Sequence, residues 1–164
     1  MQPSATRRKR GVIAGLLGGS TMALWYFLLD LASGRPFATP AALGSSLLFA
    51  KSTLEVSARV VVAYAAFHFA AFVFAGLVFV WLAEKMERKP SFLLVALLFL
   101  ILLEALALVN LASYAQWGLG SLGVWSVSVG NVLAVAVMAW YVWVTHPRLR
   151  DLGDRPPPSS AVRV

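Results

Sequence analysis

The chain has 164 residues, of which 60% are hydrophobic and 13% are charged. A soluble domain is nearer half apolar, so the composition excludes an ordinary water-soluble fold and indicates that lipid surrounds much of the chain. The formal net charge is +7, but the basic residues gather at the ends of apolar runs, which is typical of membrane topology signals rather than of nucleic-acid binding. The sequence contains no cysteine, which excludes disulfides, thiolate metal sites and iron–sulfur clusters.

The first apolar run covers residues 11–31 and follows the basic segment Arg7-Arg8-Lys9-Arg10. About 20 apolar residues are enough to cross ~30 Å of hydrocarbon. No small-x-small cleavage site follows before Gly34, so we interpret the run as an uncleaved transmembrane helix and not as a secretory signal peptide. Residues 1–10 are then expected to form a basic cytoplasmic tail.

The loop after this helix is expected to contain a short helix lying in the membrane interface. Thr39 is followed by Pro40, which predicts an N-cap with proline at the first helical position. Leu43, Leu47 and Leu48 would then share one apolar side of the short helix.

Two further transmembrane helices are predicted at residues 56–82 and 91–112. The first follows Ser52 and Glu55, whose spacing is that of a capping box. The second follows Pro90, with Ser91 available as its N-cap.

The fourth predicted helix covers residues 124–144 and ends before Pro147, because proline cannot continue the backbone hydrogen bonds of a helix. The remaining residues, 146–164, include three consecutive prolines and are expected to form a disordered or extended cytoplasmic tail. The predicted fold is therefore all-α: an antiparallel bundle of four transmembrane helices within residues 11–145.

The distribution of Lys and Arg predicts the orientation of this bundle. Four lie in the N-terminal tail, three at residues 84–90 and four after Thr145, whereas the opposite side has only Arg35, Lys51 and Arg59. Short cytoplasmic segments carry the excess of positive charge. Both termini are therefore expected on the cytoplasmic side of the cell inner membrane.

The first helix has a ridge of small residues, Gly11, Gly15, Gly19 and Ala23, at four-residue spacing. In lipid such ridges let helix backbones approach closely and gain dispersion contacts. A neighbouring helix of the same chain or a second copy could pack on this ridge. We favour the neighbouring helix, and both alternatives are open at this point.

Several polar side chains are predicted to share one layer deep in the membrane. With a rise of 1.5 Å per residue, His68, Glu104 and Asn131 each lie ~20 Å from the cytoplasmic boundary. Trp25 and Tyr26 reach a similar height on the first helix. Because the helices carrying His68 and Glu104 form a hairpin, these two side chains are expected to touch. The layer is either a set of structural hydrogen bonds or a functional site, since ionisable groups inside a membrane are rare.

A second polar layer is predicted nearer the outer boundary. It contains Asp30, Arg35, Arg59 and Asn110. We expect interfacial ion pairs there, helped by Glu55 and Arg59 at helical i,i+4 spacing.

The residues favour no specific catalytic or metal chemistry. His68 lies deep in the bilayer and His146 at its edge, so one chain does not readily supply both ligands of a haem. Three or four ligands for zinc are not found together, and no nucleophile is paired with a base. No catalytic residue, metal site or cofactor is therefore predicted.

The stretch Phe27–Gly44 (FLLDLASGRPFATPAALG), with Tyr64–His68 (YAAFH) further on, resembles a group of uncharacterised four-helix bacterial membrane proteins. The similarity covers most of residues 11–144. The resemblance implies the four-helix topology and brings no activity, substrate or cofactor with it.

The function expected from the sequence is that of a non-enzymatic accessory, scaffold or oligomer-forming subunit. Its partners would be the lipid bilayer and a second copy or a larger membrane complex, and not nucleic acid. One alternative is a proton or small-solute conduit that uses Glu104 and His68. Another is a membrane redox protein that binds haem or a different cofactor at His68.

Overall fold

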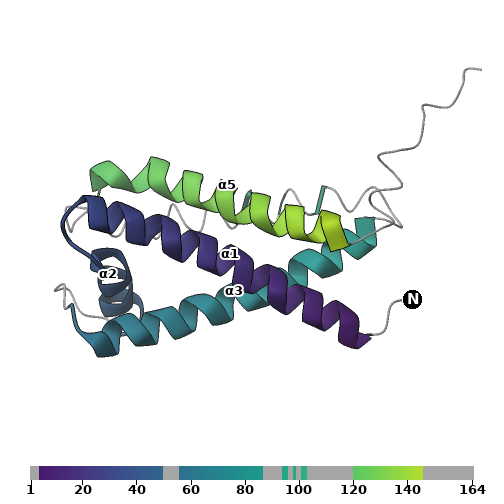
Figure 1. Ribbon diagram of the computed structural model, residues 1–164, viewed down its shortest axis with the longest axis horizontal. Coiled ribbons are helices and arrows are strands. Elements are labelled where there is room, and N and C mark those ends of the chain that lie inside the picture. The colour runs from purple at the N-terminus through teal and green to yellow at the C-terminus, as the bar shows by residue number, and fades with distance from the viewer. Residues whose placement is uncertain are drawn as a thin grey trace, which may run out of the picture.

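The structure is a computed structural model, and it describes residues 4–49, 56–86, 94–95, 98, 101–102 and 120–145. Four helices are defined in this part of the chain: α1 (Ser4–Ala32), α2 (Ala38–Leu47), α3 (Ala58–Met86) and α5 (Gly120–Thr145) (Figure 1). No residue described here belongs to a strand. The predicted all-α class is thus confirmed for these residues.

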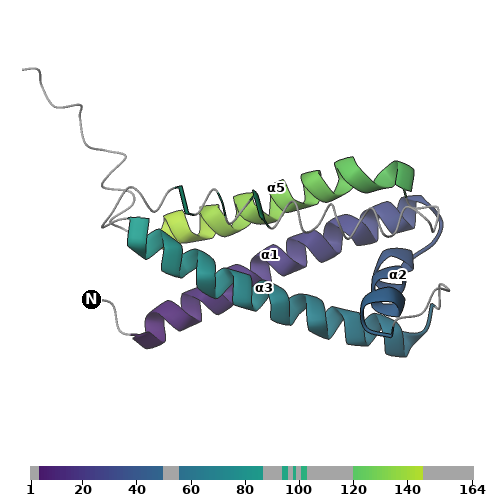
Figure 2. The same ribbon diagram turned by 180° about the vertical axis from the view of Figure 1, so that it is seen from behind.

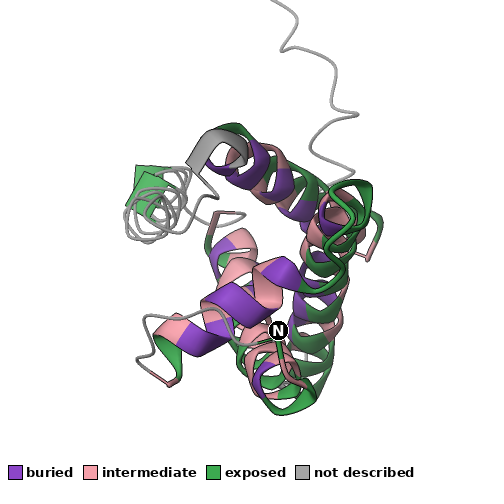
Figure 3. Ribbon diagram, turned by 90° about the vertical axis from the view of Figure 1, so that its left-hand side faces the viewer, coloured by how far each residue is buried: buried purple, intermediate pink, exposed green. Residues whose placement is uncertain are grey.

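Three of the helices are long and apolar enough to cross a membrane. These segments are Ala5–Ala32, Ala58–Met86 and Trp125–Thr145, and in their most apolar windows only 22%, 17% and 28% of the residues are buried. Exposed residues run along the sides of the long helices that face away from their neighbours (Figure 3). The outward faces are therefore suited to contact lipid, as expected for a membrane-embedded protein.

The predicted helix at residues 91–112 lies largely outside the described residues. Five of its residues are described, and each is helical and exposed: Leu94, Val95, Leu98, Ile101 and Leu102. The fourth span of the bundle therefore stays a prediction, and so does the structure of the tail at residues 146–164.

α1 begins at Ser4, seven residues before the predicted start at Gly11. The basic segment that we expected to be a tail is helical because Arg and Lys are good helix formers. The Arg7 guanidinium also lies 3.5 Å from the Glu84 carboxylate of α3. The first two turns of α1 are thus part of the fold.

At its other end α1 stops in a Schellman motif. The Gly34 amide donates to the Leu31 carbonyl and the Arg35 amide to the Asp30 carbonyl, each at 3.0 Å. Gly34 has φ of 67°, a left-handed conformation that glycine adopts without steric cost. The chain can therefore turn back at once into α2.

The N-cap of α2 is Phe37, in a left-handed conformation with φ of 67°, and the predicted N-cap Thr39 lies inside the first turn. The prediction was wrong because a side chain outside the helix, Asp30, accepts the hydrogen bond of the Thr39 amide. Pro40 is tolerated in this turn because the first amides of a helix have no partner within it.

α3 begins at Ala58, two residues after the predicted start. Ser57 caps it: the Val60 amide donates to Ser57 Oγ at 3.4 Å, and the Val61 amide donates to the Ser57 carbonyl at 3.0 Å. The predicted capping box, Ser52 with Glu55, lies outside the described residues.

α1 and α3 cross at a contact between glycines (Figure 2). A β-carbon on Gly76 of α3 would collide with the backbone of Gly11 and Gly15, and one on Gly15 would lie 2.6 Å from the Val73 Cα. These backbones are therefore in direct contact, as small residues allow in membrane helices. We call this contact the glycine crossing.

From the glycine crossing α1 and α3 diverge, and α2 lies between them at their open end (Figures 1 and 2). We call this end of the molecule the α2 end. The other side of α1 packs on α5, where Gly18 faces Met138 and Gly130 faces Met22. Within the described part of the chain α1 contacts each of the other helices, whereas α3 and α5 make few contacts with each other.

Candidate functional site

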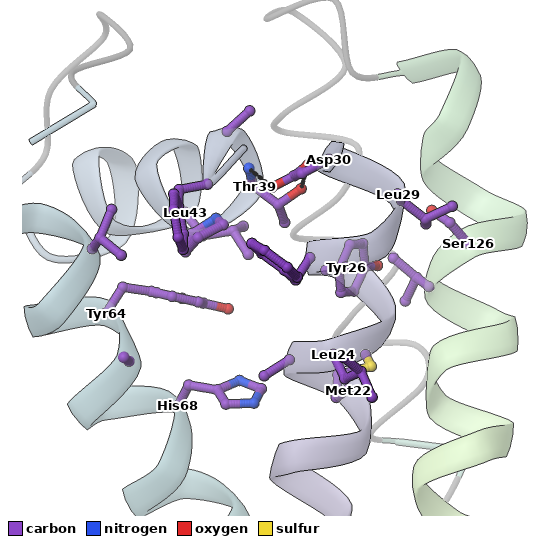
Figure 4. Close-up of a pocket in the computed structure, with 18 of the residues that line it drawn as sticks. Met22, Leu24, Tyr26, Leu29, Asp30, Thr39, Leu43, Tyr64, His68 and Ser126 are labelled. Atoms are coloured by element: carbon purple, nitrogen blue, oxygen red, sulfur yellow. Dashed lines mark hydrogen bonds between the residues drawn. The ribbon is translucent and has the colours of Figure 1, made fainter. Parts of the chain in front are cut away.

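A cavity of about 710 Å³ lies at the α2 end, lined by residues of α1, α2, α3 and α5. It exists because α1 and α3 diverge from the glycine crossing and the short α2 spans the gap between them (Figure 4). Cavities of roughly 300 to 1,000 Å³ are typical of small-molecule sites. The cavity is therefore large enough for a ligand.

Most of the lining is apolar, with side chains such as Leu24, Phe27, Leu43, Leu47 and Phe69. A few polar side chains interrupt it, and they include Tyr26, Asp30, Thr39, Tyr64, His68 and Asn131. An apolar wall with a small number of polar groups is the usual composition of a binding site for an amphipathic molecule.

His68 is half-buried on α3, and its partner is a backbone group of α1. Its Nε2 lies 3.0 Å from the Gly19 carbonyl oxygen. A carbonyl oxygen only accepts hydrogen bonds, so Nε2 carries the proton and donates it. The bond ties α3 to α1 at the point where the two helices begin to separate.

Aromatic rings on α3 hold the imidazole in place. The ring centroid of His68 lies 4.7 Å from that of Phe72, 5.5 Å from that of Phe69 and 5.9 Å from that of Tyr64. Ring pairs at these separations are within the favourable range for aromatic contacts. The orientation of the imidazole is therefore fixed by packing as well as by the Gly19 bond.

Asp30 is buried near the end of α1, with 6% of its surface exposed. Its carboxylate accepts two hydrogen bonds from Thr39, one from the amide at 2.8 Å and one from the hydroxyl at 2.7 Å (Figure 4). A negative charge beside the first turn of a helix is also favoured by the helix dipole. Asp30 thus replaces the missing side-chain cap of α2 and anchors α2 over the cavity.

The expected ion pairs of the outer layer are not formed among the residues that the structure describes. Asp30 binds Thr39 instead of Arg35 or Arg59, because the Thr39 donors are brought next to it by the Schellman turn. The Arg59 guanidinium lies over the Phe49 ring, 5.6 Å from its centroid. Two other members of the prediction, Glu55 and Asn110, lie outside the described residues.

The predicted deep layer is partly brought together. Three of its members, Tyr26, His68 and Asn131, line the same cavity from three helices. Trp25 instead lies between α1 and α5, where its indole N–H donates to the Ser126 carbonyl at 2.9 Å and its ring meets Trp125 edge-on at 6.0 Å. Glu104 lies outside the described residues, so its contact with His68 stays a prediction.

The glycine ridge of α1 packs against another helix of the same chain. Gly11, Gly15 and Gly19 all pack against α3, whereas Ala23 is exposed and lines the cavity. The alternative that a second copy fills this groove is therefore excluded for the three glycines. Gly76 was missed in the sequence, although a single glycine within a long apolar helix is itself a sign of close backbone approach.

The described residues include side chains of the kinds that ligate metal ions, His, Asp and Glu. Within the described ranges no three His, Asp or Glu side chains gather in a way that could hold a metal ion. A haem or metal at His68 would have to use Nδ1, because Nε2 is bonded to the Gly19 carbonyl. The lining is better suited to bind an organic molecule than to bind a metal.

No family model matches the chain, and no curated protein or solved structure matches it either. The resemblance to four-helix bacterial membrane proteins therefore stays a prediction.

Proposed function

We propose that this chain is a non-enzymatic integral membrane protein that binds a lipid-like small molecule in the cavity at the α2 end. The observation that supports the proposal is the cavity of about 710 Å³ between α1, α2, α3 and α5, with apolar walls and few polar groups. An amphipathic molecule dissolved in the bilayer would exchange lipid surroundings for these walls and add hydrogen bonds to the polar groups.

The proposal develops the accessory role expected from the sequence. Lipid-like molecules are available to a protein whose long helices expose their apolar faces. The glycine ridge is already filled by α3, so a partner subunit or a second copy would pack on the exposed apolar faces instead. A binding protein of this kind would present or sequester its ligand for other membrane proteins.

We further propose that both termini face the cytoplasm of a bacterial cell. The excess of Lys and Arg near residues 7–10, 85–89 and 148–163 supports this orientation. The start of α1 and the end of α5 lie at the same end of the molecule (Figure 1), which also supports it. The α2 end, with the cavity, would then lie in the outer half of the membrane.

Binding can be tested with photoactivatable lipids. The full chain, in nanodiscs, is irradiated with hexadecyl probes that carry a diazirine in the chain and a hydroxyl, a methyl ether or a carboxyl as head group. Labelled residues are then identified by mass spectrometry. We expect at least one probe to label lining residues, and excess unlabelled compound to compete with it.

A matched pair of variants separates cavity binding from contact with bulk lipid. Ala65 lines the cavity and its neighbour Ala66 is exposed on the outside of α3. Ala65→Phe should fill the cavity and abolish the labelling of lining residues, whereas Ala66→Phe should leave it unchanged. Labelling confined to the outward faces, or equal labelling in both variants, would overturn the proposal.

A further inference from the structure

We infer that the ligand is a neutral lipid with a free hydroxyl group, and that this hydroxyl donates a hydrogen bond to Nδ1 of His68. The inference rests on the proposed binding function and adds the chemistry of the ligand's polar group. Three observations on the cavity support it: the hydrogen bond at the other ring nitrogen, the direction of the imidazole and the position of the charges.

The bond to Gly19 fixes which nitrogen of His68 can accept. Nε2 donates to the Gly19 carbonyl at 3.0 Å. In the neutral imidazole only one nitrogen carries a proton, so Nδ1 has a lone pair and is an acceptor. A ligand that reaches Nδ1 must therefore bring a donor, and a hydroxyl is the donor that an otherwise apolar membrane molecule most commonly carries.

The imidazole is also directed at the cavity. His68 and Tyr64 both extend from α3 across the space towards α1 (Figure 4), and both belong to the lining. Contacts with Phe69 and Phe72 keep the ring in this direction. Because the acceptor is held in place before the ligand arrives, little ordering of the side chain opposes binding.

The charges of the cavity exclude a strongly charged head group next to His68. Among the described lining residues, only Asp30 has a carboxylate side chain and only Arg35 a guanidinium. Asp30 is bonded to Thr39, and Arg35 is exposed in the turn after α1. Asp30 lies eleven residues beyond Gly19 on α1, which is roughly 16 Å along the helix axis. A phosphate or ammonium group beside His68 would therefore lack a counter-charge among these residues.

The test compares three competitors that differ only in the head group. In nanodiscs the diazirine-hexadecanol probe labels the wild-type chain in competition with 1-hexadecanol, its methyl ether or hexadecanoic acid. One neutral hydrogen bond should make the alcohol roughly threefold to tenfold more effective than the ether. Equal competition by the alcohol and the ether would overturn the inference, and so would strongest competition by the acid.

Two variants identify the acceptor. His68→Phe keeps an aromatic ring and removes both nitrogens, so the alcohol and the ether should then compete equally. Thr21→Val removes an α1 hydroxyl that bonds the Leu17 carbonyl and does not belong to the lining, so it should leave the preference for the alcohol intact. A preference that persists in His68→Phe would show that another group accepts the hydroxyl.

The outcomes also separate this inference from the proposed function. If no probe of any head group labels the lining residues, the binding function fails and the inference fails with it. If the probes label the lining but show no preference for the hydroxyl, the binding function stands and only the inference is overturned. If His68→Phe does not fold, the comparison of the alcohol with the ether on the wild-type chain still tests whether the cavity prefers a hydroxyl.

Discussion

α1 and α3 are held together differently at the glycine crossing and at the α2 end. At the crossing Gly11, Gly15 and Gly76 bring the two backbones into contact, and no space remains for a side chain. At the α2 end the helices separate around a cavity of about 710 Å³, and His68 and Asp30 bind backbone groups of neighbouring helices. The contact at the crossing depends on the small volume of the glycines, and the contact at the α2 end depends on hydrogen bonds.

The difference shows how one pair of helices can combine rigidity with an open site. Dispersion contacts at close range are lost steeply when atoms are forced apart, so the crossing tolerates little change in size. Hydrogen bonds across a wider gap tolerate a change in size nearby but not the loss of a donor or acceptor. Added side-chain volume should therefore destabilise the glycine crossing and be tolerated at the α2 end, where loss of a donor or acceptor should destabilise instead.

The largest effect is expected from added volume at the crossing. Gly15→Leu places a side chain where the backbone of α3 lies, and overpacking of this kind costs about 1–3 kcal/mol or more. The thermal midpoint of unfolding in detergent should fall clearly, and Gly76→Leu should behave in the same way.

Two substitutions of similar size serve as controls for this result. Ala70→Leu adds volume on an exposed position of α3, and Ala65→Leu adds it to the cavity wall. Both should unfold close to the wild-type temperature. If Gly15→Leu also unfolded close to the wild-type temperature, the crossing would not be the rigid contact that we describe.

A smaller effect is expected when the anchor of α2 is removed. Asp30→Ala leaves two donors of Thr39 without their partner, and loss of a helix cap costs about 0.5–2 kcal/mol. Amide hydrogen exchange should accelerate in residues 38–47 and change little at the glycine crossing. Asp30→Asn keeps one acceptor oxygen and should lie between Asp30→Ala and wild type, whereas an unchanged exchange rate in Asp30→Ala would contradict the anchor.

His68→Phe should weaken the contact between α3 and α1 by about 0.6–2 kcal/mol, the range found for hydrogen bonds between membrane helices. The reason is the loss of the bond from Nε2 to the Gly19 carbonyl, while the aromatic packing is largely kept. The unfolding temperature measures this loss. His68→Gln can still donate from its amide and should recover part of it, and equal stability of both variants would argue against the bond.

The smallest effect is expected at the interface of α1 with α5. Trp25→Phe removes the N–H that binds the Ser126 carbonyl and keeps an aromatic contact with Trp125, so we expect a loss of about 0.6 kcal/mol. Trp140→Phe, at a position that is 65% exposed, is the matched control and should have no measurable effect on the unfolding temperature.

The sequence predicted the features that depend on local composition. Runs of apolar residues predict membrane-crossing helices whatever packs against them, and three such helices are present. The spacing of Gly11, Gly15 and Gly19 predicted a close helix contact, and it exists. In both cases the signal lies within one segment of the chain, whichever helix packs against that segment.

The features that were missed depend on backbone groups brought together by turns. His68 was expected to bind a side chain, and it binds the Gly19 carbonyl, which has no signature in the sequence. Asp30 was expected to pair with Arg35, and it caps α2 because the turn with the left-handed Gly34 and Phe37 brings the start of α2 next to it. The partner of Glu104 stays a prediction because that residue lies outside the described part of the chain.

The central position of α1 has a consequence for how the protein is made. α1 precedes α3 and α5 in the chain, and a ribosome therefore delivers it to the membrane before either of them. Both helices make most of their contacts with α1 and few with each other. Each later helix can thus dock on α1 as it emerges, and neither has to wait for the other.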